Sequence, residues 1–179
     1  MESYEKAREK YKPEHIRYLL IAESPPPAAS IQSSRQFYYT DRIRKDDRLF
    51  INTVRALYPE TIETPEPELE AQKEALLHRL QQDGIYMIEA LESSQEHEVT
   101  KKQRRERISK TLPQLLERVK KLAAQDTKLI LIKSNVYDEA AEPLRAAGFT
   151  VLNTGLVDYP GRFNQRAYRE KLANLVNGV

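Results

Sequence analysis

The sequence predicts an α/β protein with three layers (α/β/α), in which helices cover both faces of a four-stranded, mostly parallel central sheet. Short apolar runs alternate along the chain with longer segments whose apolar residues recur at the spacing of one helix face. The runs are almost continuously apolar, which is typical of parallel strands covered on both faces. This alternation favours a single α/β layer architecture.

Four apolar runs are expected to form the strands of this sheet. They span Ile16–Ala22, Gly84–Leu91, Lys128–Lys133 and Phe149–Asn153. Because crossovers between parallel strands are right-handed, the C-terminal ends of the strands should meet at one edge of the sheet. Open α/β sheets bind ligands at this edge. The strand exits AESPPP, EALESS, KSNVYD and NTGLVDYPGRFNQ are therefore the places to look for a site.

Helices are expected in the segments between the strands. The predicted helices span Asp46–Leu57, Glu68–Gln82, Glu98–Lys110, Thr111 to about Ala124, Asp138–Ala146 and a C-terminal segment that follows Asn164. Thr111 is expected to cap a helix of its own, in whose first turn Pro113 is tolerated. Gly84 lies just past the end of the second helix, where glycine commonly ends helices.

The composition is that of a soluble globular protein. Hydrophobic residues make up 40% and charged residues 31% of the 179 residues, which suits one domain with a proper core. We expect a single domain over residues 1–179, with an N-terminal helix over 1–14 and a core over 15–179. No apolar stretch has membrane-spanning length, and the N-terminus lacks the apolar core of a signal peptide, so we predict a cytoplasmic protein. A monomer is the default expectation.

Several catalytic signatures are absent from the chain. It has no cysteine, which excludes disulfides, cysteine-ligated metal centres and a cysteine nucleophile. His15, His78 and His97 lack the spacing of metal ligands. There is no phosphate-binding loop, dinucleotide glycine fingerprint or Gly-x-Ser-x-Gly elbow. We therefore expect neither a metal nor a cofactor, and a kinase, a nucleotide-driven motor, a Rossmann dehydrogenase or a serine hydrolase of that type is disfavoured.

The first strand ends at Glu23, and prolines follow it at once. A carboxylate at this edge would be partly desolvated, and it could orient a water molecule or stabilise developing positive charge. The prolines at 25, 26 and 27 would hold the backbone beside it with little entropy left to lose. The alternative is structural: Glu23 caps the next turn or pairs with a nearby arginine.

Two groups of residues could contact a planar base. Phe37, Tyr38 and Tyr39 follow the prolines, and one of these rings could stack on a base. The alternative is that adjacent aromatic residues pack a loop onto the core. Glu89 ends the second strand and could accept hydrogen bonds from an amino or imino group of a base. It could equally pair with a basic residue between Lys101 and Lys110.

Two segments could contact phosphates. In the loop Asp158–Gln165, Gly161 permits a close approach of a ligand, Arg162 can hold a phosphate in a forked contact, and Asn164 begins a helix whose N-terminus attracts anions. The alternative is a turn followed by an ordinary helix cap. The segment Thr100–Lys110 is strongly basic and could follow a nucleic-acid backbone through Lys101, Lys102, Arg104 and Arg105. The alternative is a solvated helix face.

The order of these features resembles the uracil-DNA glycosylase superfamily over roughly Ile16 to Val176. The first motif of that family reads Gly-Glu-Ala-Pro-Gly in one branch, and the corresponding segment here reads AESPP. The resemblance implies a four-stranded parallel sheet between helices. It also implies that Glu23 helps water to attack the sugar carbon and supports the cationic sugar, with Ser24 and Pro25 beside the substrate. Phe37 or Tyr38 would stack on the flipped base.

The resemblance extends to the second and fourth strands, with departures. Glu89 stands where the second strand of the family commonly ends in an asparagine that reads the base. The segment YPGRFNQ, from Tyr159, stands where the family has a His-Pro-Ser-like motif that touches DNA and stabilises the departing base. Here Tyr159, Arg162 or Asn164 would supply the hydrogen-bond donor that stabilises the departing base. Because the cysteines of the iron–sulfur branches are absent, the resemblance implies a divergent member without a cluster.

Three hypotheses follow from these residues. The leading one is a DNA base glycosylase-like hydrolase in DNA repair, which flips a modified or mismatched base out of the stack and cleaves it off through a carboxylate-assisted water. The second is a catalytically altered module that binds nucleic acid or a nucleotide at the same cleft. The third is an enzyme that acts on a small molecule such as a free nucleoside or a sugar phosphate.

Overall fold

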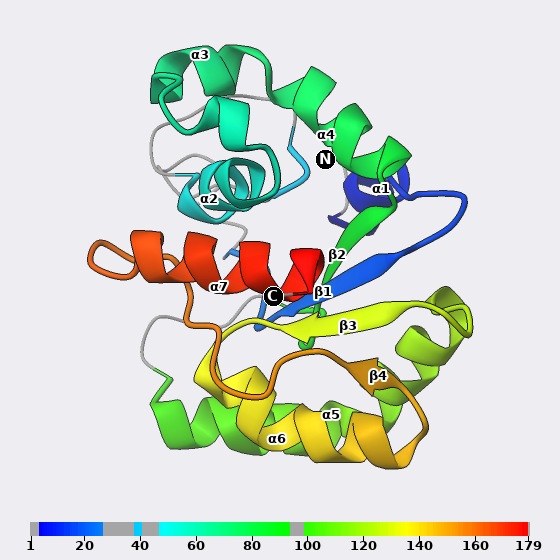
Figure 1. The fold of residues 1–179 in the computed structure, drawn as a ribbon. Coiled ribbons are helices and arrows are strands. Elements are labelled where there is room, and N and C mark those ends of the chain that lie inside the picture. Colours follow the sequence, from blue (N-terminus) through cyan, green and yellow to red (C-terminus); the bar gives the residue numbers. More distant parts are fainter. Residues whose placement is uncertain (1–3, 27–37, 41–46, 94–98, 179) are drawn as a thin grey trace.

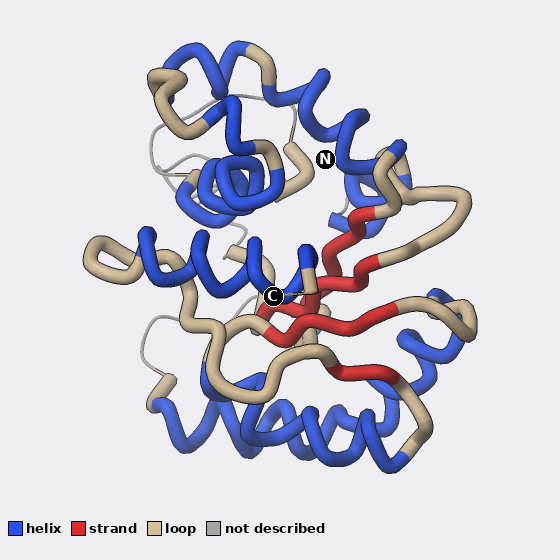
Figure 2. Tube along the Cα trace, in the orientation of Figure 1, coloured by secondary structure: helices blue, strands red, loops and turns tan. Residues whose placement is uncertain are grey.

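The computed structural model describes residues 4–26, 38–40, 47–93 and 99–178, and it confirms the three-layer α/β/α fold. A four-stranded, all-parallel sheet with the strand order β2-β1-β3-β4 lies between two layers of helices (Figure 1). Figure 2 shows the strands together in the middle of the molecule, with helices on either side.

The four strands fall within the four apolar runs but are shorter than the runs. They are β1 (Tyr18–Ala22), β2 (Ile85–Glu89), β3 (Lys128–Leu131) and β4 (Thr150–Val151). Every residue of β1 and β2 is buried, which explains why these strands read as continuous apolar runs. In the register of the sheet Ala22 pairs with Glu89 and Ile21 with Leu131, so the C-terminal ends of β1, β2 and β3 meet at one edge.

The helices form one layer on each side of the sheet. They are α1 (Tyr4–Glu9), α2 (Arg48–Leu57), α3 (Glu66–Ala71), α4 (Lys73–Gln82), α5 (Lys101–Leu122), α6 (Ser134–Ala146) and α7 (Gln165–Asn177), with a short 3-10 helix at Pro59–Thr61. Helices α5 and α6 pack together on one face, whereas α7, with α2 packed on it, lies on the other (Figure 1). Within the described residues, no helix combines the length and the apolar character needed to cross a membrane.

The prediction of two helices around Thr111 is wrong, because α5 runs unbroken from Lys101 to Leu122. Thr100 is the true cap: its hydroxyl accepts the backbone N–H of Gln103, whose side chain bonds back to Thr100. The hydroxyl of Thr111 instead donates to the carbonyl of Arg107 inside the helix. Pro113 is tolerated in the interior of this long helix rather than in a first turn.

Other predicted helices also differ in extent from the structure, and the one predicted over Asp138–Ala146 begins earlier, at Ser134. The segment 68–82 is divided by Gln72 into α3 and α4, a break that the leucine spacing conceals because the pattern continues through it. Lys73 follows the break, is buried, and pairs with the buried Asp47 just before α2. The N-terminal helix expected over 1–14 is described only as Tyr4–Glu9. It ends ahead of Pro13, which lacks an N–H and disfavours helical backbone in the residue before it.

Candidate functional site

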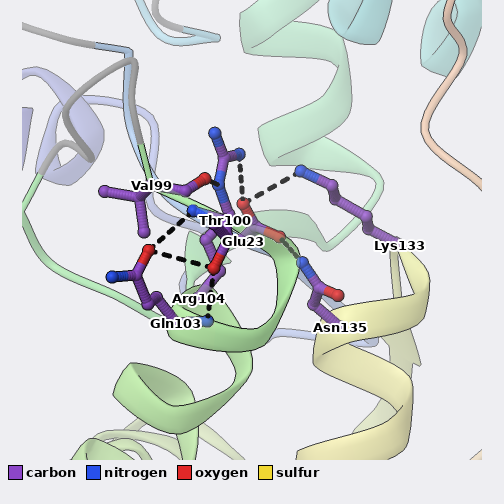
Figure 3. Close-up of polar contacts among 7 residues, drawn as sticks. All are labelled: Glu23, Val99, Thr100, Gln103, Arg104, Lys133 and Asn135. Atoms are coloured by element: carbon purple, nitrogen blue, oxygen red, sulfur yellow. Dashed lines mark hydrogen bonds and ion pairs between the residues drawn. The ribbon is translucent and has the colours of Figure 1, made fainter.

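The carboxylate of Glu23 lies at the centre of a polar cluster where β1 ends. The side chain is only 5% exposed. Its Oε1 atom accepts hydrogen bonds from Lys133 Nζ at 2.9 Å and from Arg104 Nη1 at 3.1 Å, and its Oε2 accepts one from Asn135 Nδ2 at 2.6 Å. Figure 3 shows these donors converging on Glu23 from the first turn of α5 and from the start of α6. Three separate elements therefore meet at this carboxylate.

The cluster holds Glu23 in its ionised form. Burial by itself would raise the pKa of Glu23, because it removes water from the charged form. The hydrogen bond and the charge of Lys133, together with the hydrogen bonds from Asn135 and Arg104, outweigh this effect and bring the pKa below its ordinary value of 4.5. At neutral pH the site thus contains one carboxylate and two cations.

Arg104 reaches Glu23 because of how α5 begins. The capping box at Thr100 fixes the first turn of the helix, and the guanidinium of Arg104 also donates through Nε to the carbonyl of Val99 at 3.2 Å (Figure 3). The sequence places Arg104 among the residues expected to contact a nucleic-acid backbone. The structure turns it toward Glu23, as the structural alternative for Glu23 expected of a nearby arginine.

Lys133 reaches Glu23 from an unusual backbone conformation. Its φ of 82° and ψ of 142° make it the one non-glycine residue with a positive φ in the described part of the chain. Such a conformation costs about 1–3 kcal/mol for a residue with a side chain. The surrounding backbone maintains it: the N–H of Lys133 donates to the carbonyl of Val157 at 2.7 Å, and its carbonyl accepts the N–H of Tyr137 at 3.1 Å. The contact with Val157 also joins the loop after β4 to this edge.

Glu89, at the end of β2, is enclosed in a different way. Its carboxylate forms an ion pair of 2.5 Å with Arg8 in α1, and Arg118 in α5 donates to the carbonyls of Glu89 and Ala90 at 2.9 and 2.8 Å. Burial raises the pKa of Glu89, and Arg8 only partly opposes this effect. Among the described residues its ion-pair partner thus comes from the N-terminal helix and not from the segment Lys101–Lys110.

The proline segment begins at the rim of the Glu23 cluster. Ser24 is half-buried and Pro25 is buried. The carbonyl of Pro26 accepts a hydrogen bond from the hydroxyl of Tyr4 at 2.7 Å, so α1 fastens the described part of this segment. Pro27 lies outside the described residues.

The predicted stacking residues are placed in the core where the structure describes them. Tyr38 and Tyr39 are both buried, with ring centroids 5.0 Å apart, and Tyr38 also packs edge-on against Phe50 at 5.5 Å. The hydroxyl of Tyr39 accepts the N–H of Met87 in β2 at 2.6 Å. This placement favours the packing alternative for both tyrosines. Phe37 lies outside the described residues.

The loop after β4 presents exposed aromatic side chains near the same edge. Tyr159 is 43% exposed and Phe163 is 90% exposed, and the guanidinium of Arg162 lies 5.7 Å from the Phe163 ring centroid. Gly161 has no positive φ, and an added Cβ there would meet only the carbonyl of Tyr159 at 4.0 Å. Asn164 precedes α7 without a capping hydrogen bond from its side chain. Arg162 and Asn164 are both exposed in this loop.

The basic segment divides into residues that face outward and residues engaged in ion pairs. Lys101 and Lys102 are exposed and line a shallow hollow over α5 and α6, together with Arg105, Glu106, Ser109, Lys110 and Glu139. Arg105 is held by Glu139 at 2.6 Å and by Asp138 at 3.4 Å. Two of the four predicted backbone-contacting cations, Lys101 and Lys102, thus face outward.

Sequence reasoning missed Lys133, Asn135 and Arg8 as members of these two clusters. The segment KSNVYD is a predicted strand exit, and its polar residues directly after an apolar run are the available signal for Lys133 and Asn135. Arg8 precedes the first strand, so no strand-exit argument reaches it. Among the described residues no three histidine, aspartate or glutamate side chains form a group that could hold a metal ion.

The Glu23 cluster combines a buried, ionised carboxylate with two partly exposed cations at the C-terminal edge of a parallel sheet, the edge at which open α/β sheets generally bind ligands. Such a combination can stabilise positive charge at one atom of a ligand while it binds an anionic group nearby. No protein family model, curated protein or solved structure matched this chain.

Proposed function

We propose that this protein is a DNA base glycosylase-like hydrolase that acts on a modified or mismatched base. The observation that carries the proposal is the position and charge of Glu23. It is a buried carboxylate with a lowered pKa at the C-terminal end of a central strand, beside the loop that follows β4. Cleavage of a glycosidic bond develops positive charge on the sugar, and a fixed carboxylate beneath the sugar stabilises that charge.

The hydrogen bonds of Glu23 leave one acceptor site on the carboxylate. A carboxylate has about four lone-pair sites. In the described residues Oε1 accepts two hydrogen bonds and Oε2 accepts one, from Asn135. The remaining site on Oε2 can accept a proton of the attacking water, while Asn135 and Lys133 keep the carboxylate from rotating.

The surrounding cations support a phosphate-bearing substrate over a free nucleoside. Lys133 and Arg104 are 34% and 28% exposed, so each can contact an anion while it remains near Glu23. Lys101 and Lys102 face outward on the first turn of the same helix as Arg104. Tyr159, Arg162 or Asn164, in the loop after β4, would donate a hydrogen bond to the departing base.

A base-release assay tests this proposal. Oligonucleotides, single- and double-stranded, would carry uracil, hypoxanthine, xanthine or a mismatch, and hot alkali would convert abasic sites into strand breaks. We expect release from at least one substrate, with a rate that falls by about 10²–10³-fold in Glu23→Gln, the loss typical when one preorganised charge-stabilising group is removed. Glu142→Gln is the matched control, because Glu142 is exposed on α6 and pairs only with the neighbouring Arg145 among the described residues.

A specific observation favours the second candidate function, a binding module without catalysis. Two cations and an amide already bond to Glu23, and Glu89 is enclosed by Arg8 rather than presented to a base. A module of this kind would bind DNA with a strong salt dependence. It would release no base from any substrate, and Glu23→Gln would leave its affinity unchanged. Base release that depends on Glu23 would exclude it.

A further inference from the structure

The strained backbone of Lys133 places a primary amine in the Glu23 cluster. Glycine would adopt a φ of 82° without strain, but it would bring no side chain to the site. Strain of this kind is kept where the side chain has a task, and it concentrates at functional sites. Lys133 thus occupies a backbone conformation that glycine would adopt with less strain, and it brings an amine to the site.

The amine is partly exposed and lies beside a carboxylate and a second cation. The side chain of Lys133 is 34% exposed, whereas that of Glu23 is 5% exposed, so the lysine is the more accessible member of the pair. Nζ donates to Glu23 Oε1 at 2.9 Å, and Asn135 holds the other carboxylate oxygen at 2.6 Å (Figure 3). Arg104 donates to the same Oε1 at 3.1 Å, and a lysine beside another cationic group is one of the arrangements in which lysines attack carbonyl groups.

We propose that Lys133 is a nucleophile that forms an imine with the aldehyde of an abasic deoxyribose, which gives the protein a strand-cleaving lyase activity. The inference rests on the proposed function for its substrate class, because an abasic sugar is the product of base release. Arg104 shares Oε1 of Glu23 with Lys133 but cannot serve as the nucleophile, because a guanidinium does not lose its proton in proteins.

The reaction balances without any further reagent. The ammonium of Lys133 first gives up a proton to solvent, and the free amine then bonds to C1′ of the open-chain sugar. Glu23 relays one proton from the nitrogen to the carbonyl oxygen and a second proton from solvent follows, so the oxygen leaves as water. The product is a protonated imine. Glu23 then takes a proton from C2′, the C2′–C3′ double bond forms, and the bond from C3′ to oxygen breaks with the 3′ phosphate as the leaving group. Water hydrolyses the imine and returns the free amine of Lys133.

Borohydride trapping tests this inference. The protein would be mixed with a labelled oligonucleotide that already contains an abasic site, and sodium borohydride would reduce the imine to a stable amine that retards the labelled strand in a denaturing gel. We expect a trapped complex and alkali-independent strand cleavage with the wild type. Lys133→Arg should reduce trapping at least about tenfold, because arginine keeps a cation beside Glu23 but is not nucleophilic. Lys120→Arg, an exposed substitution on α5, is the matched control and should trap like the wild type.

The trapping experiment distinguishes failure of this inference from failure of the proposed function. Equal trapping by Lys133→Arg, or no trapping by the wild type at saturating protein, would overturn the inference. The denaturant unfolding curve of Lys133→Arg should match that of the wild type. Where arginine disturbs the fold, Lys133→Gln takes its place, and trapping by Lys133→Gln equal to that of the wild type would likewise overturn the inference. Base release is detected with alkali and needs no imine, so a protein that releases bases without trapping retains the proposed function and loses only the lyase.

Discussion

Glu23 and Glu89 lie at the ends of neighbouring strands, yet their surroundings differ in a way that separates a site from a structural contact. The residue before Glu23 pairs with Glu89 in the sheet. Glu23 is held by partly exposed cations and an amide that bring its pKa below the ordinary value, whereas Glu89 is enclosed with Arg8 and has a raised pKa. Accessible partners, rather than the carboxylate itself, therefore mark the functional candidate.

The largest expected effect on stability comes from the Glu89 side of the comparison. Arg8→Ala leaves a buried carboxylate without its ion-pair partner, which costs about 3–5 kcal/mol of the free energy of unfolding. Arg104→Ala leaves Glu23 with Lys133 and Asn135, and the loss should be no more than about 1 kcal/mol for so exposed a partner. Urea unfolding of both variants measures the difference. Equal losses would break the distinction between the two clusters.

Charge reversal of the outward-facing lysines should weaken nucleic-acid binding without an effect on the fold. Lys101→Glu combined with Lys102→Glu removes two cations from the hollow over α5 and α6. The slope of log affinity against log salt should fall by about 0.9 for each phosphate of duplex DNA that the variant no longer neutralises. Fluorescence anisotropy with a labelled oligonucleotide at several salt concentrations measures it, with Lys120→Glu as the control. An unchanged slope would remove this surface from the interface.

Lys133→Gly should show how much the strained backbone of Lys133 changes the free energy of unfolding. The substitution relieves a conformation that costs about 1–3 kcal/mol, loses a partly exposed ion pair worth about 0–1 kcal/mol, and adds about 0.4–1 kcal/mol of unfolded-state entropy. The free energy of unfolding should therefore change by only about 1 kcal/mol, while borohydride trapping is abolished. A large loss of stability would instead assign Lys133 a structural role.

The smallest expected effect is a difference in the pH dependence of stability. The folded-state pKa of Glu23 lies below its ordinary value of 4.5, so its stabilisation is complete above pH 4.5 and is lost as the pH falls through the folded-state pKa. The folded-state pKa of Glu89 lies above 4.5, so stability increases as the pH falls through that pKa toward 4.5. Unfolding of the wild type, Glu23→Gln and Glu89→Gln across this range should give differences of opposite slope. The same sign for both would contradict the comparison.

Features that depend on neighbours in the sequence could be predicted, whereas features that depend on distant contacts could not. Continuous burial of β1 and β2 produces continuous apolar runs, so the strands and the ligand-binding edge were predictable. The long helix α5 was not, because Thr111 has the chemistry of a cap even where it bonds back inside a helix. Glu23 was found at its strand exit, but Lys133 lies 110 residues away along the chain, and no local pattern joins the two.

The direction of a side chain was the hardest feature to predict. Arg104 and Lys101 lie three residues apart in one basic segment, yet Arg104 donates to Glu23 and to the carbonyl of Val99, whereas Lys101 is exposed. Tyr38 and Tyr39 read equally well as stacking rings or as core residues, and the structure packs them against each other, with Tyr38 against Phe50 and Tyr39 bonded to β2. Such orientations depend on packing that a single sequence does not reveal.

The most direct test of the proposed role of Glu23 is the single-turnover rate of base release by the wild type and by Glu23→Gln, on the panel of modified and mismatched oligonucleotides. We expect release by the wild type and a fall of about 10²–10³-fold in the variant, with the free energy of unfolding of the variant measured alongside to show that it remains folded. Release that continues at the wild-type rate without the Glu23 carboxylate, or no release from any substrate, would contradict this role.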